Sequence, residues 1–206
     1  MKCTKITVTG GPSGGKTTLL ESLKREFAKD ITIVPEAASI LYRGGFPRGK
    51  TPEARICVQT TIYHVQLNLE EFYRVSRLRP LMICDRGSLD SVAYWPSSEE
   101  NFFETMGTTA QHELDRYHWV IHLDTAPMGD YDETNPIRTE SFSEAVTLNQ
   151  RVKEAWRNHP RRIIIPGQTD FLTKMTLATS VVDAIQRGED TASVQKLTTS
   201  TSLAAR

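Results

Sequence analysis

The sequence has no excess of either charge. It contains 25 lysine and arginine residues and 25 aspartate and glutamate residues, for a net charge of zero. A main partner such as nucleic acid or an anionic membrane usually calls for a strongly basic protein, so this balance argues against both. Long hydrophobic runs are also missing, since no apolar stretch approaches the roughly 20 residues that span a bilayer. We therefore expect neither a membrane segment nor nucleic acid as the main partner, although local basic clusters exist.

Cysteine is scarce as well. The three cysteines are Cys3, Cys57 and Cys84, an odd number with spacings that fit no metal-binding pattern. Cys84 stands in a strongly apolar run, which predicts a buried thiol. A reduced, cytoplasmic setting fits this usage best. We expect no signal peptide, because the N-terminus leads directly into a predicted strand.

Hydrophobic periodicity divides the 206 residues into alternating strands and helices, and the length suits one domain with a substantial core. Short apolar, β-branched runs predict five strands, at residues 5–9, 31–34, 81–84, 118–123 and 163–165. Strands that alternate with helices predict an α/β fold, in which a parallel sheet has helices on both faces.

Apolar residues at steps of three and four predict which helix faces are buried. A long helix from residue 51 to about 77 is expected to bury Val58, Ile62, Val65, Leu69 and Phe72. A capping box of Ser141 and Glu144 opens a later helix. The last predicted helix is expected to bury Phe171, Met175, Ala178, Val182 and Ile185. We predict a domain at residues 1–187 and a flexible tail, rich in Thr, Ser and Ala, at 188–206.

The segment from Gly10 to Thr17 reads Gly-Gly-Pro-Ser-Gly-Gly-Lys-Thr and fits the phosphate-binding pattern G-x-x-x-x-G-K-[ST] at every fixed position. It follows a predicted strand and precedes a predicted helix, the order that phosphate binding needs. Glycines let main-chain N–H groups turn toward phosphate oxygens, and the helix N-terminus adds partial positive charge. The residues predicted to bind the nucleotide are Gly11, Pro12, Ser13, Gly14, Gly15, Lys16, Thr17 and Thr18.

Two acidic residues follow predicted strands, at the sheet edge where ligands gather. Asp85 ends the third strand and is expected to hold Mg²⁺, directly or through water, together with the Thr17 hydroxyl. Glu36 ends the second strand, and three roles are open for it: it could accept a proton from an attacking hydroxyl, hold the magnesium ion indirectly through its ligands, or cap the next helix. His118 and His122 lie on the fourth strand and are interpreted as ordinary strand histidines.

Positive charge at the site is expected from Lys16, which would reach the β- and γ-phosphates, and from two arginines. Arg86 follows Asp85, and Arg138 lies in an aperiodic, proline-containing stretch at residues 125–140 that we interpret as a lid. Lys16, Glu36, Asp85, Arg86 and Arg138 are therefore the predicted catalytic residues.

These motifs resemble the AAA-type ATP/GTP-binding family of P-loop NTPases, in its nucleoside- and nucleotide-kinase-like branch. The branch includes a ribosylnicotinamide kinase domain and a GTP-binding photoreceptor trafficking protein. The resemblance covers about residues 4 to 186, and it is carried by Thr9–Thr18, Val34–Ala38, Asp85-Arg86-Gly87, Asn135–Glu140, and Trp156 with His159-Pro160. It implies a five-stranded parallel sheet in the order 2-3-1-4-5, a lid after strand four, and an acceptor that faces both the loop after strand two and the Asp85-Arg86 pair. Gly87 departs from the branch, where a Ser or an aromatic residue often follows, so the acceptor stays open.

Three functions compete. The first is a kinase that moves the γ-phosphoryl of ATP or GTP to a small-molecule acceptor, with Mg²⁺ as cofactor. The second is a nucleotide-dependent switch with slow hydrolysis, although no guanine-reading motif is present, since Thr173–Thr176 lacks the aspartate. The third is a nucleic-acid 5′-end kinase. The neutral charge balance argues against it, and the basic cluster of Arg157, Arg161 and Arg162 is the feature that favours it. The sequence does not define the preferred base, which topology would place at Pro166-Gly167-Gln168.

Overall fold

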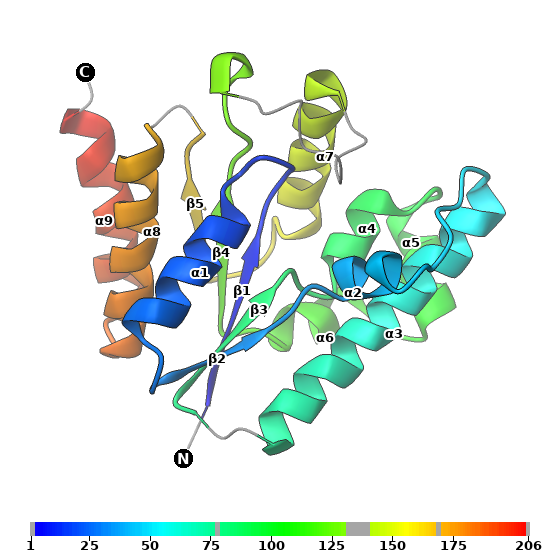
Figure 1. Ribbon diagram of the computed structural model, residues 1–206, viewed down its shortest axis with the longest axis horizontal. Coiled ribbons are helices and arrows are strands. Elements are labelled where there is room, and N and C mark those ends of the chain that lie inside the picture. The colour runs from blue at the N-terminus through cyan, green and yellow to red at the C-terminus, as the bar shows by residue number, and fades with distance from the viewer. Residues whose placement is uncertain (1–2, 77–78, 131–140, 168–169, 205–206) are drawn as a thin grey trace.

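The structure is a computed structural model that describes residues 3–76, 79–130, 141–167 and 170–204 (Figure 1). Five strands form one parallel sheet in the order β2-β3-β1-β4-β5, which confirms the predicted fold. The strands are β1 (Thr4–Thr9), β2 (Ile31–Val34), β3 (Leu81–Asp85), β4 (Trp119–Leu123) and β5 (Arg162–Ile165). The side chains of β4 are all buried, as expected where helices cover both faces of a parallel sheet.

Two groups of helices enclose the sheet (Figure 1). The core on one face joins the sheet to α1 (Lys16–Glu26), α8 (Phe171–Gln186) and α9 (Thr191–Ala204). The core on the other face joins it to α3 (Pro52–Ser76), α4 (Asp90–Tyr94), α6 (Ala110–Asp115) and α7 (Phe142–Ala155). The remaining short elements are α2 (Ala37–Arg43), α5 (Glu99–Met106) and a 3-10 turn, η1 (Met128–Asp130).

Helix α3 has the predicted extent but buries a different face. Its buried residues are Val58, Gln59, Tyr63, Gln66 and Glu70. Of the predicted stripe, only Val58 is buried, and Phe72 is 58% exposed. The prediction was wrong because polar side chains on the inner face have partners there: Glu70, for example, accepts hydrogen bonds from Tyr117 and Lys5. A buried polar group with partners costs little, so polarity alone did not mark the outer face.

The C-terminal segment also differs from the prediction, because residues 191–204 form helix α9 instead of a flexible tail. The helix packs against α8 and β5, and Val194 is fully buried there. Val194, with the partly buried Leu197, therefore anchors a segment whose composition predicted little burial. Within the described residues, no helix combines the length and the apolar character that crossing a bilayer requires.

Candidate functional site

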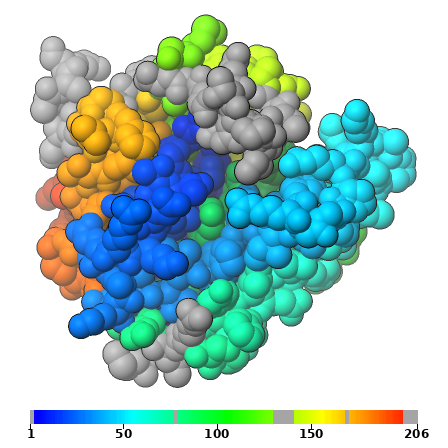
Figure 2. All heavy atoms as spheres, viewed as in Figure 1, coloured from blue at the N-terminus to red at the C-terminus, as the bar shows by residue number. Residues whose placement is uncertain are grey.

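The phosphate loop runs between β1 and α1 and bends around the end of β4. Gly10 and Gly15 have φ angles of 130° and 89°, which side-chain-bearing residues rarely adopt. A Cβ atom on Gly10 would lie 2.0 Å from the Leu123 carbonyl oxygen, so only glycine lets the loop approach β4 this closely. The surface is hollowed beside this loop, between α1 and the segment around α2 (Figure 2).

Lys16 lies at the start of α1 and turns back onto the loop. Its Nζ donates to the carbonyl oxygens of Gly10, at 2.8 Å, and Gly11, at 2.7 Å. Burial and the nearby Arg86 charge lower the pKa of Lys16 to about 7, against the opposing effect of the neighbouring carboxylates. A phosphate group would supply the negative charge that this ammonium lacks. Thr17 and Thr18, on the same first turn, are exposed.

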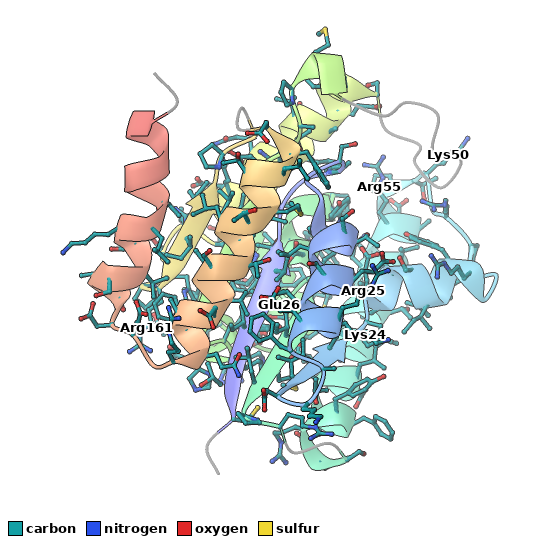
Figure 3. The ribbon with its side chains drawn as sticks, turned by 60° about the vertical axis from the view of Figure 1, so that its left-hand side comes forward. Lys24, Arg25, Glu26, Lys50, Arg55 and Arg161 are labelled. Atoms are coloured by element: carbon teal, nitrogen blue, oxygen red, sulfur yellow. The ribbon has the colours of Figure 1, made fainter. Side chains whose placement is uncertain are left out.

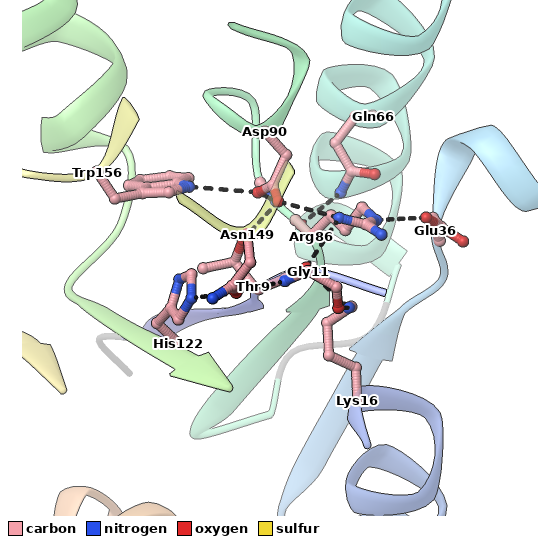
Figure 4. A network of polar contacts seen from close by, with 12 residues as sticks. Thr9, Gly11, Lys16, Glu36, Gln66, Arg86, Asp90, His122, Asn149 and Trp156 are labelled. Atoms are coloured by element: carbon pink, nitrogen blue, oxygen red, sulfur yellow. Dashed lines mark hydrogen bonds and ion pairs between the residues drawn. The ribbon is translucent and has the colours of Figure 1, made fainter. Parts of the chain in front are cut away.

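Glu36 and Arg86 form an ion pair where β2 and β3 end (Figure 4). Arg86 Nε lies 2.5 Å from Glu36 Oε1, and the Ser39 hydroxyl donates to the other carboxylate oxygen. Burial alone would raise the pKa of Glu36, but the Arg86 charge and the two hydrogen bonds outweigh it and lower the pKa. Glu36 stands at the N-cap position of α2, but its side chain makes no capping hydrogen bond, so of the three roles considered for it the side-chain cap is wrong.

Asp90, on α4, fixes the turn that carries Arg86. Its carboxylate accepts from the Thr9 hydroxyl, from Gly87 N at 2.9 Å and from Trp156 Nε1 at 3.3 Å, and Arg86 Nη1 lies 3.3 Å away (Figure 4). Arg86 itself has a φ angle of 70°, an uncommon conformation for a residue with a side chain. The network of Asp90 holds this conformation in place.

Gly87 is glycine for a packing reason. A Cβ atom there would lie 2.8 Å from Trp156 Cζ2 and 2.9 Å from Thr7 Oγ1. Trp156, at the end of α7, thus occupies the space that a larger residue after Asp85-Arg86 would need. The indole ring of Trp156 therefore fills the space that a Ser or aromatic side chain would take at position 87.

Gln66 connects the two halves of the ion pair from α3. Its amide nitrogen lies 3.4 Å from the Arg86 carbonyl oxygen, and its amide oxygen accepts from Ala37 N at 3.3 Å. Ala37 follows Glu36 directly, so one buried amide holds both the start of α2 and the turn after β3. Gln66 therefore helps to position both Glu36 and Arg86 through the backbone, without a hydrogen bond to either charged group.

Asp85 ends β3, level with Val8 of β1 in the sheet register. Burial and the neighbouring Glu36 charge raise the pKa of Asp85 to about 6, although Arg86 and Lys16 act in the opposite direction. Its negative charge is thus incompletely balanced by the protein. The Asp85 carboxylate and the Thr17 hydroxyl, on the first turn of α1, are oxygen ligands of the kind that Mg²⁺ prefers. In donor type, these two residues are compatible with a magnesium ion.

Asn149, on α7, supports the phosphate loop from the other side. Its Oδ1 accepts from Gly11 N at 3.0 Å and lies 2.9 Å from His122 Nε2. Because this oxygen only accepts, His122 Nε2 carries the hydrogen. Asn149 Nδ2 donates to Asp124 Oδ1 at 2.9 Å, and Lys153 Nζ lies 2.7 Å from the same oxygen. Strand β4, helix α7 and the phosphate loop are thereby joined by one polar network.

The predicted lid lies largely outside the described residues, and so do Arg138 and Gln168. The described site brings together the phosphate loop, Glu36, Asp85 and Arg86. Sequence reasoning missed Gln66, Asp90 and Asn149, which sit inside helices and match no motif. Their only signal was a polar residue on the inner face of a helix, and His122, read as an ordinary strand histidine, belongs to the same network.

The three arginines considered for nucleic-acid binding each have a different surrounding. Arg157 Nη1 lies 2.9 Å from Glu99 Oε1, and Arg162 donates to the Lys153 carbonyl oxygen at 2.7 Å. The Arg161 guanidinium lies 5.6 Å from the centre of the Trp119 ring. Figure 3 shows Arg161 well apart from the other labelled basic residues, which are Lys24, Arg25, Lys50 and Arg55.

Comparison with known proteins places this geometry in context. A solved structure of deoxyadenosine kinase from M. mycoides with bound dATP has a TM-score of 0.58 and 14% identity, over 87% of this chain and 99% of that chain. A structure of the same enzyme with the products dCMP and a flexible dCDP has a TM-score of 0.58 and 13% identity, with the same coverage. The shared feature at this identity is the fold, the five-stranded P-loop kinase fold. No curated protein matches the chain.

A family model described as an AAA domain matches residues 5–173, which is most of the sequence. The match includes the phosphate loop and extends through the strands that carry Glu36, Asp85 and Arg86. The chain therefore belongs to the AAA domain family of P-loop NTPases.

Proposed function

We propose that this protein is a magnesium-dependent kinase that transfers the γ-phosphoryl group of ATP or GTP to a small-molecule acceptor. The observation that carries the proposal is the Glu36–Arg86 ion pair beside the phosphate loop. A protein that only holds a nucleotide needs the loop, but it has no need of a partly buried pair of carboxylate and guanidinium where β2 and β3 end. The similar solved structures support the choice, since their descriptions name a kinase with dATP and with the products dCMP and dCDP.

Each residue has a role in this proposal. The amides of residues 13–18 and the Lys16 ammonium bind the phosphates. Glu36 is ionised, because its pKa is lowered, and its carboxylate would accept the proton of an acceptor hydroxyl. Arg86, held by Glu36 and Asp90, neutralises charge on the transferred group. Arg138 would add to this charge from the predicted lid.

Thr17 and Asp85 would hold the magnesium ion. When bound, it neutralises charge on the β- and γ-phosphate oxygens. Asp85 contributes its incompletely balanced carboxylate, and Thr17 its exposed hydroxyl.

The protein's cysteines are free thiols in the described structure, and the cytoplasm is the setting that we propose.

The experiment is a turnover assay with Mg-ATP and Mg-GTP against a panel of nucleosides, deoxynucleosides, nucleoside monophosphates and cofactor precursors. We expect acceptor-dependent ADP or GDP formation with at least one compound. Glu36→Gln should retain nucleotide binding and lower kcat about 100-fold, in the range of general-base catalysis. Tight nucleotide binding with no acceptor-dependent turnover across the panel would contradict the kinase and favour the switch.

A further inference from the structure

Phe171 stands in an unexpected place. The helical period assigns it to the buried stripe of α8, yet it is 52% exposed. Its ring lies beside the phosphate loop: Cε2 is 3.4 Å from the position that a Cβ on Gly15 would take, and Met175 Cε is 3.0 Å from the same point. An exposed phenyl ring and a methionine methyl group thus flank the last glycine of the loop.

The neighbouring residue provides a contrast. Leu172 is 75% exposed and lines a shallow groove with Leu197, between α8 and α9. Phe171 is not among the residues that line this groove. The two exposed apolar side chains at the start of α8 therefore serve different surfaces, and only Phe171 lies against the phosphate loop.

The order of the strands separates the two ends of the site. Glu36 follows β2, at one edge of the sheet, while α8 follows β5, at the opposite edge. A triphosphate in the loop directs its γ-phosphate toward Glu36 and Arg86, if the transfer proposed above takes place. Its nucleoside must then leave the loop on the other side, past the exposed first turn of α1, which α8 packs beside (Figure 1).

We propose that Phe171, backed by Met175, is the platform on which the nucleobase of the bound triphosphate stacks. The inference rests on the proposed function and names a residue that binds the nucleoside part of its phosphoryl donor. Aromatic side chains stack on bases of every type, because every base offers a π-face. The platform therefore explains affinity for a nucleoside triphosphate, without selecting adenine over guanine.

The test compares two ligands that share their phosphates, Mg-ATP and magnesium tripolyphosphate, by calorimetry. Phe171→Ala should weaken ATP binding by about tenfold or more, as measured for base-stacking residues, and change tripolyphosphate binding less than about twofold. Leu172→Ala is the matched control and should change neither affinity. Phe171→Trp should retain ATP affinity, and its fluorescence should respond to ATP and not to tripolyphosphate.

Several results would overturn the platform. Unchanged ATP affinity in Phe171→Ala would do so, and so would equal losses for both ligands, which would mean that Phe171 only supports the loop. Either result leaves the acceptor-dependent turnover of the wild type intact, so the kinase proposal is judged separately. A wild-type protein that binds neither ligand contradicts the phosphate site itself and the platform with it.

Discussion

Lys16 fastens the phosphate loop from within, because its ammonium donates to two main-chain oxygens of that loop. The same side chain is partly buried, and this burial together with the nearby Arg86 charge lowers the pKa of its ammonium. A bound phosphate would stabilise the charged form of the Lys16 ammonium. At this position, the stability of the loop and its affinity for an anion therefore depend on one side chain.

Lys16→Ala should abolish detectable binding of ATP and GTP, with a loss of about 100-fold or more, since charge-assisted hydrogen bonds to phosphate disappear. The fold should persist, because Lys16 is only partly buried and the variant also removes the cost of desolvating its charge. Calorimetry and thermal unfolding measure the two effects. Lys24→Ala, at the far end of α1, should leave both unchanged (Figure 3). Retained affinity in Lys16→Ala would contradict the site.

Asp90 supports a second prediction at the same scale. Asp90→Asn keeps the shape of the side chain but removes the charge opposite Arg86 and one of the two oxygens that accept. We expect a loss of about 2–3 kcal/mol in the free energy of unfolding, as for a broken, largely buried ion pair. Urea unfolding measures it, with the exposed Asp115→Asn as control. A change below about 0.5 kcal/mol would show that the network does not hold the turn.

At the scale of elements, α7 joins parts of the site that are distant in sequence. Its buried side touches the phosphate loop through Asn149, while the residue that ends it, Trp156, packs on Gly87. The capping box of Ser141 and Glu144 fixes where the helix begins, as predicted. A single helix thus sets the spacing between the loop and the turn that carries Arg86.

The network around Asp124 makes the contact between β4, α7 and the phosphate loop sensitive to acid. Burial alone would raise the pKa of Asp124, but hydrogen bonds from His122, Lys153 and Asn149 outweigh it and hold the pKa far below its usual range. A lowered carboxylate pKa stabilises the fold above the unfolded value of about 4, and the contribution is lost progressively as the pH falls from there through the lower folded pKa. Asp124→Asn should therefore flatten the decline of stability between about pH 5 and 3. Urea unfolding over that range tests it, and an unchanged slope would contradict the assignment.

Most elements were predictable because the strands are short runs rich in apolar and β-branched residues, and several helices have a hydrophobic period or a cap. Helix α9 was not predictable in this way, because its sequence is poor in apolar residues. Which helix face is buried was less predictable. Gln66 and Glu70 lie inside because they find hydrogen-bond partners on elements distant in sequence. Phe171 lies outside although it continues an apolar stripe. The hydrophobic period is a property of one helix alone, whereas the face that is buried depends on the elements that pack against that helix.

The same limit applied to the site. Glu36, Asp85 and Arg86 were predictable because the carboxyl ends of parallel strands meet at one edge of a sheet. The side chains that hold them, Asp90 among them, come from helices whose placement only the fold reveals. The left-handed conformation of Arg86 had no local signal either, since a residue of this type seldom adopts it.

At the scale of the whole molecule, α9 covers the edge of the core beside β5. It packs against α8 and β5 and buries Val194. Val194→Ala should cost about 2 kcal/mol, through lost burial and the cavity left behind. For a domain of this size that lowers Tm by about 4–8 °C. Gln195→Ala, on the exposed side, is the control, and calorimetry measures both. ATP affinity should not change, and an unaltered Tm would mean that α9 contributes nothing to the core.

The course of the chain has a practical consequence for assays. β1 enters the sheet from the end opposite the phosphate loop, while α9 climbs back toward the end where that loop lies (Figure 1). A fusion partner or biosensor surface attached ahead of β1 would leave the nucleotide entrance facing bulk solvent. Attachment after α9 would bring the foreign group to the same end of the molecule as the entrance, so immobilised binding measurements should use the amino-terminal linkage.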